Sequence, residues 1–158
     1  MPDWSRRATL AEYFRVGLIA DLLTPEDAAN WAISEIARLD APPYELIEVS
    51  YAKTPLDAIA ALASVQGDRD RQMAGAWALA RLRESLRGPD FDVRSAAHQA
   101  MRIVRAADFR DDIYYRFDTI EDEVSLALTG TYGTLEDCRA HLLNELARYP
   151  LPPLHHSG

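Results

Sequence analysis

Residues 93–107 read VRSAAHQAMRIVRAA, and their apolar side chains recur every three or four positions. That spacing aligns side chains along one side of an α-helix. Arginines and a glutamine occupy half of the other positions, which predicts a helix with one buried and one solvated side. The buried stripe should consist of Val93, Ala96, Ala97, Ala100, Met101, Val104 and Ala107, and the solvated side of Arg94, Gln99, Arg102 and Arg105.

The stripe is rich in alanine, so a second helix can approach it closely. The preceding predicted helix, residues 69–87, carries small residues at Ala74, Gly75 and Ala78. We therefore expect these two helices to be in contact. The helical preference extends along the chain, because 25 of its 158 residues are alanine and only 7 are glycine.

Five short motifs predict where other helices begin. A Thr or Asp side chain can accept a hydrogen bond from a backbone N–H that the first helical turn leaves unpaired. A carboxylate three residues later can complete a capping box, and Pro25 and Pro55 suit a first turn. The predicted capping residues are Thr9, Thr24, Thr54, Asp118 and Thr134.

Two segments are less clear. YELIEVSY, residues 44–51, reads as a short strand or as a helix with Tyr44, Ile47, Ser50 and Tyr51 along one face. We favour the helix, because the chain offers no plausible partner strand. A short helical piece around residues 113–117 is expected before the helix that follows Asp118.

These elements predict an all-α fold in one domain, residues 1–149. It should be a single compact irregular bundle of about seven to nine amphipathic helices joined by short turns, or a stack of helical hairpins. Residues 150–158, with three prolines, cannot continue a helix and should form a surface tail.

Residues 24–40 and 134–149 share Thr, Glu and Asp at their starts and Glu, Ala and Arg further on. The first three residue types suit any helix start, because early carboxylates also meet the positive end of the helix dipole. We interpret the likeness as shared helix chemistry, with duplication as the less favoured alternative.

The compartment expected from the sequence is the cytoplasm. Cys138 is the only cysteine, so it cannot form an internal disulfide, and the N-terminus lacks the pattern of a secretory signal. The apolar runs are far shorter than the roughly 20 residues that a membrane helix needs. We expect no membrane association.

The formal net charge is −8, and the acidity increases along the chain. Residues 1–105 carry 13 basic and 15 acidic residues, whereas residues 106–158 carry 4 and 10. A negative field repels the phosphate backbone, so a nucleic-acid partner is disfavoured and a basic protein partner is favoured. Alternatively, the charge only keeps the molecules apart in solution.

The motifs of catalysis are missing. There is no G-x-S-x-G turn, and Cys138 follows Glu136 and Asp137, which oppose a thiolate. Asp137 and His141 share a helix face, but the chain has no Glu-x-x-His pair and no EF-hand loop. We predict no catalytic residue, no metal site and no cofactor.

The favoured functional hypothesis is a non-catalytic inhibitor that binds another protein, such as an immunity protein neutralising a basic toxin domain. Clustered carboxylates would speed the encounter and tyrosines would anchor it. The expected partner-binding residues are Asp108, Asp111, Asp112, Tyr114, Tyr115, Asp118, Glu121, Asp122 and Glu123.

Two alternatives stay open. A helical adaptor would show an exposed apolar groove rather than a concentrated negative field. A metal-dependent enzyme, the less favoured alternative, would gather the late carboxylates and His141 inwards around a cavity. Outward-facing acids would count against the enzyme.

Overall fold

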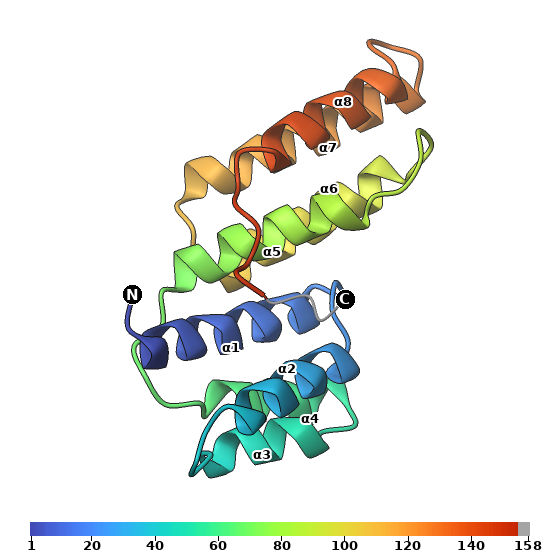
Figure 1. Ribbon diagram of the computed structural model, residues 1–158. Helices are drawn as coiled ribbons and strands as arrows, with labels where there is room; N and C mark the ends of the chain where they lie inside the picture. The colour runs from blue at the N-terminus through green and yellow to red at the C-terminus, as the bar shows by residue number, and fades with distance from the viewer. Residues whose placement is uncertain (155–158) are drawn as a thin grey trace. The chain divides into compact units, whose positions relative to one another are not determined.

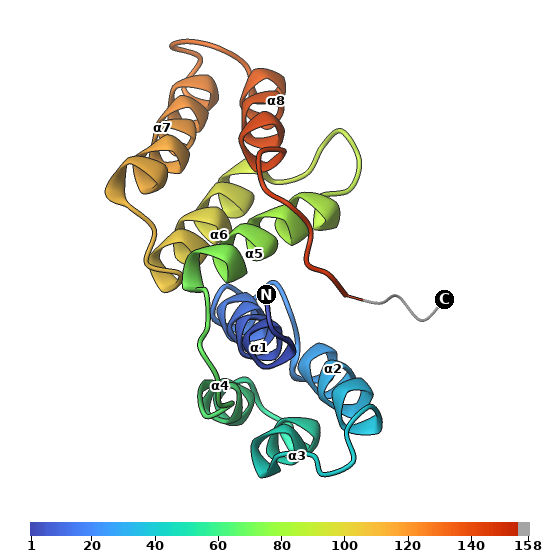
Figure 2. The same ribbon diagram turned by 60° about the vertical axis from the view of Figure 1, so that its left-hand side comes forward.

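The computed structural model describes residues 1–154. Within this range the chain forms eight α-helices and no β-strand, which confirms the predicted all-α class (Figures 1 and 2). The helices are α1 (Asp3–Ile19), α2 (Pro25–Ala37), α3 (Tyr44–Tyr51), α4 (Pro55–Ala63), α5 (Arg71–Ser85), α6 (Val93–Ala106), α7 (Asp111–Leu128) and α8 (Leu135–Leu146).

Contacts along the backbone group the chain into two compact units, Met1–Ala74 and the part from Gly75 onwards. We describe each unit by itself, and the single domain expected over residues 1–149 stays a prediction. Residues 150–154 belong to no helix, and Leu151 is exposed. The rest of the predicted tail, residues 155–158, lies outside the described residues.

The first unit is built on α1, which packs against α2 and α4, while α3 packs against the same two helices. Phe14 of α1 stacks on Trp31 of α2 with 5.2 Å between ring centroids. Leu46 of α3 and Leu62 of α4 are fully buried. Two helical pairs therefore share one apolar core.

In the second unit α6, α7 and α8 pack against one another. Their buried side chains include Ile103, Phe117, Ile120 and Leu142. The close approach expected between residues 69–87 and the alanine stripe is present at Gly75 of α5, where an added β-carbon would overlap that of Ala107. Within the stripe, Ile103 is buried whereas Met101 is only half-buried.

Three of the five predicted helix starts are confirmed. The hydroxyl groups of Thr24, Thr54 and Thr134 accept from backbone N–H groups three residues later, at 3.2, 3.2 and 3.1 Å. At α2 the Asp27 carboxylate also accepts from the Thr24 N–H at 2.8 Å, which completes the capping box. The preference for a helix over residues 44–51 is also confirmed.

The start predicted at Thr9 is wrong, because α1 already begins at Asp3. Thr9 is fully buried, and its hydroxyl accepts from the distant backbone N–H of Asp70 at 3.0 Å. Its sequence pattern matches a capping box, but the Thr side chain serves a tertiary contact instead.

The start predicted at Asp118 is also wrong, because α7 runs unbroken from Asp111 to Leu128. The Thr119 hydroxyl donates to the Tyr115 carbonyl one turn earlier at 2.8 Å, a bond that a mid-helix threonine can make. The short piece around residues 113–117 and the helix expected after Asp118 are therefore one helix.

Glu12 is the carboxylate that the sequence pattern pairs with Thr9 in a capping box. It lies instead in the interior of the first unit, with 2% of its surface exposed. Both of its oxygens accept from the Arg15 Nε, at 2.7 and 2.9 Å, and one accepts from Arg69 at 3.2 Å. Arg69 also donates to the carbonyls of Leu62 and Val65, at 3.2 and 2.7 Å. It thus joins the end of α4 to α1.

Burial raises the pKa of Glu12, but the hydrogen bonds and charges of Arg15 and Arg69 outweigh burial, so the pKa lies below its ordinary value of 4.5. Folding lowers the pKa of this carboxyl, so the carboxylate stabilises the protein at any pH above the pKa that the group has in the unfolded chain. That stabilisation disappears as the pH falls through the folded pKa.

Glu12→Gln should therefore lower the free energy of unfolding at neutral pH by about 1–3 kcal/mol, because it removes charged hydrogen bonds. The difference from the unsubstituted chain should shrink below about pH 4, where the unfolded carboxyl is protonated. Urea unfolding followed by tryptophan fluorescence from pH 7 to pH 3 measures it. Glu48→Gln, at an exposed carboxylate of the same unit, is the control. A difference that is constant over this range would contradict the assignment.

Gly75→Ala should destabilise the second unit. An added methyl group would overlap Ala107 and lie 2.9 Å from the Phe109 ring, so α5 would have to move. We expect a loss of about 1–3 kcal/mol from overpacking, although glycine to alanine in an open helix gains about 1 kcal/mol. Urea unfolding followed by circular dichroism measures the change. Glu84→Ala, at an exposed position of α5 in the same unit, should have little effect.

Candidate functional site

Helix α7 carries eight of the nine expected partner-binding residues, and Asp108 precedes it in a left-handed turn with φ of 58°. Asp111 and Asp112 occupy the first turn, where carboxylates meet the positive end of the helix dipole. Phe117, Ile120 and Val124 form the buried side of the helix. The acidic residues are therefore distributed around the remaining circumference.

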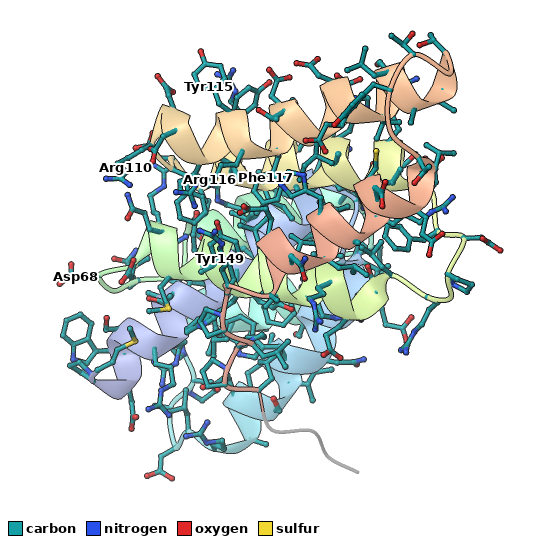
Figure 3. The ribbon with its side chains drawn as sticks, turned by 90° about the horizontal axis from the view of Figure 1, so that it is seen from above. Asp68, Arg110, Tyr115, Arg116, Phe117 and Tyr149 are labelled. Carbon is teal, nitrogen blue, oxygen red and sulfur yellow. The ribbon has the colours of Figure 1, made fainter. Side chains whose placement is uncertain are left out.

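Tyr115 lies on the outer side of α7, with 59% of its surface exposed, whereas Phe117 lies on the inner side (Figure 3). Asp111, Asp112 and Asp122 are exposed, and Asp118, Glu121 and Glu123 are half-buried. We call the solvent side of α7 that contains Tyr115, Asp118, Glu121 and Asp122 the acidic face.

Two glutamates of α7 face cationic or imidazole groups of neighbouring helices. A Glu121 oxygen lies 3.6 Å from Arg94 Nε and 3.5 Å from His98 Nε2, both on α6. Glu123 Oε2 lies 2.9 Å from His141 Nδ1 on α8. These two glutamates thus connect α7 to both of its neighbouring helices. The sequence predicts them as residues that contact a protein partner.

Tyr114 is also engaged within its own unit. The Arg105 guanidinium lies 4.1 Å above its ring centroid, and the Tyr115 ring meets it edge-on at 5.8 Å. Arg110 pairs with Asp112 at 3.2 Å, but both side chains are well exposed, so the pair contributes little stability. Of the two tyrosines, Tyr115 is the better placed to reach a partner.

Both units carry a net negative charge when the charges are summed for each unit separately. Residues 1–74 carry 7 basic and 12 acidic residues, a net −5, and residues 75–158 carry 10 and 13, a net −3. Residues 75–105 alone carry 6 basic and 3 acidic residues. The second unit therefore has a basic segment beside acidic α7, and the negative charge of this unit is concentrated on that helix.

Carboxylate oxygens of Asp118, Glu121 and Asp122 lie within 4.8 Å of one another. Their spacing of three and four residues places them on one side of α7. Three oxygens at this distance can hold a hard divalent cation, but Arg94 and His98 lie beside Glu121, and the positive charge of the guanidinium opposes a metal ion there. The arrangement equally suits a Lys or Arg side chain from another protein.

His141 and the carboxylate cluster, which a metal-dependent enzyme would bring together, do not form one site. His141 bonds to Glu123 and is not a member of the carboxylate cluster. Cys138 has 3% of its surface exposed, and burial, followed by the charges of Glu123 and Asp137, raises the pKa of its thiol. Its environment favours the thiol over the reactive thiolate.

A second surface was not identified from the sequence. Tyr44 and Tyr51 share a face of α3 as predicted, but this face is exposed, whereas Leu46 and Val49 face the core. Tyrosines seven residues apart, with two glutamates between them, were the available signal.

Comparison with protein-family models, with curated proteins and with solved structures finds no match for this chain. Among residues 1–154, no helix combines the length and the apolar character that crossing a bilayer requires.

Asp118→Asn should stabilise the second unit slightly, by about 0.3–1 kcal/mol at low salt, because it removes one of three crowded like charges. The gain should diminish at high salt. Thermal unfolding in low and high salt measures it, with exposed Asp90→Asn as the control. A loss of stability would contradict repulsion within the cluster.

Proposed function

We propose that this chain is a non-catalytic protein-binding inhibitor that contacts a basic partner through the acidic face of α7. An immunity protein that covers the active site of a basic toxin domain is the specific form of this proposal. The observation that carries it is the cluster of Asp118, Glu121 and Asp122 carboxylates on the solvent side of a helix that also exposes Tyr115.

Electrostatics supports a cationic partner. Three carboxylates within 4.8 Å repel one another in the free chain, and a Lys or Arg side chain from a partner would relieve that repulsion. A local negative surface also accelerates the encounter with a positive one. Binding of this kind is fast and sensitive to salt.

Rigidity supports a specific contact rather than loose attraction. The buried Phe117 and Ile120 fix α7 in its unit, and the hydrogen bond between Glu123 and His141 of α8 restrains its rotation. The acidic face is therefore arranged before binding, so little conformational entropy is lost. Tyr115 adds a large amphipathic side chain of the type enriched among interface anchors.

The test compares two variants of equal charge. Asp118→Asn and Asp122→Asn together neutralise two carboxylates of the acidic face, and Asp40→Asn and Asp90→Asn together neutralise two exposed carboxylates elsewhere. Each chain is used to capture proteins from its native host. Association with the captured partner is then measured by stopped flow at low and high salt.

We expect a basic partner whose association rate falls roughly tenfold or more as salt rises from about 20 to about 300 mM. The α7 variant should associate several-fold more slowly, and the control variant should resemble the unsubstituted chain. Capture of a partner whose association is insensitive to salt, or equal effects of both variants, would reject the proposal.

A further inference from the structure

We infer that the groove between α3 and α4 is a second docking surface, which takes a basic amphipathic segment of another protein. This surface lies in the Met1–Ala74 unit, so the inference goes beyond the function proposed for α7.

The groove is an open hollow with a volume of about 580 Å³. Its walls come from α3 and α4, which pack against each other within the unit. The lining residues are Tyr44, Ile47, Glu48, Tyr51, Ala52, Asp57, Ala60, Ala61 and Ser64. A helix of eight residues forms one wall, so a segment of about two or three helical turns would fill it.

Two tyrosines stand on the α3 side of this groove. Tyr44 and Tyr51 are 70% and 73% exposed, and a separation of seven residues places them about 10 Å apart on the same side of the helix. The core uses the other side of α3, where Leu46 and Val49 are fully buried. Helix α3 thus has an apolar side that serves the fold and an aromatic side that does not.

Small side chains allow close approach from the α4 side. Ala60 and Ala61 line the groove beside the half-buried Ile47 of α3. Alanines at a helical surface let the backbone of a second helix approach, and an isoleucine gives its apolar side chains a contact. This floor fits the apolar side of an amphipathic segment.

Charge determines which amphipathic segment fits. Glu48 lies between the two tyrosines in sequence, Asp57 lines the α4 side, and both are exposed. None of the lining residues is basic. An apolar segment without cations would desolvate these carboxylates with no compensation, and an anionic one would be repelled. A Lys or Arg could instead pair with Glu48 or Asp57 and lie against a tyrosine ring.

A random peptide display library provides the test. The full chain is the target, and selections are repeated on Tyr44→Ala/Tyr51→Ala, on Glu48→Gln/Asp57→Asn, and on the control Tyr132→Ala, which removes an exposed tyrosine of the second unit. Circular dichroism verifies that each variant is folded. The strongest peptide is titrated into ¹⁵N-labelled protein to map its contacts by NMR.

The inference predicts enriched peptides with apolar residues at helical spacing flanked by Lys or Arg. Their amide shifts should map to residues 44–64, and affinity should fall roughly tenfold in either double variant but not in the control. Failure to enrich such peptides, or binding that survives both double variants, would overturn it.

Two other outcomes would also overturn the inference. Shifts confined to α7, abolished by Asp122→Asn, would assign the peptides to the acidic face and support the proposed function instead. A self-associating chain that Tyr44→Ala/Tyr51→Ala converts to a monomer would show that the groove holds a second copy. The two proposals can fail separately. If no basic partner binds α7 but the selected peptides bind the groove, only the proposed function is rejected.

Discussion

The first unit depends on one ionic cluster, formed by Glu12 with Arg15 and Arg69. A buried carboxylate is costly unless its oxygens are bonded, and Glu12 has both oxygens bonded to guanidinium groups. Arg69 also donates to the carbonyls of Leu62 and Val65 near the end of α4. The cluster therefore fixes α1 relative to α4, and the groove between α3 and α4 is built on that frame.

In the second unit the corresponding role belongs to α7. Its apolar side fills the space between α6 and α8. Glu121 faces Arg94 and His98 of α6 at 3.6 and 3.5 Å, and Glu123 is hydrogen-bonded to His141 of α8. The same helix offers its outer carboxylates to solvent. One element thus combines internal pairing with an external charge, and Glu121 belongs to both.

Much of the fold was predictable, because helix starts and apolar spacing are local properties. Thr24, Thr54 and Thr134 cap helices as their motifs predict. Thr9 and Asp118 carry equally good motifs, but a capping box in sequence does not reveal whether the chain before it is already helical. Thr9 is explained only by its bond to Asp70, 61 residues away, which no local pattern contains.

The concentration of carboxylates on α7 was predictable from the sequence, but their pairing with neighbouring helices was not. The density of acids at residues 108–123 identified α7, yet the pairing of Glu121 and Glu123 depends on which sides of α6 and α8 meet it. The aromatic side of α3 illustrates the same limit. Tyr44 and Tyr51 could be assigned to one face, but only tertiary packing shows that this face is not the core.

Cys138 provides a way to observe the dynamics of the second unit. It is the only sulfhydryl group in the chain, and it is buried near the start of α8. A thiol reagent can attack it only when the surrounding structure opens. The rate of alkylation in native buffer therefore reports the frequency of that opening without any mutation or label. Docking of a protein on α7 would slow it if the bound state suppresses such fluctuations.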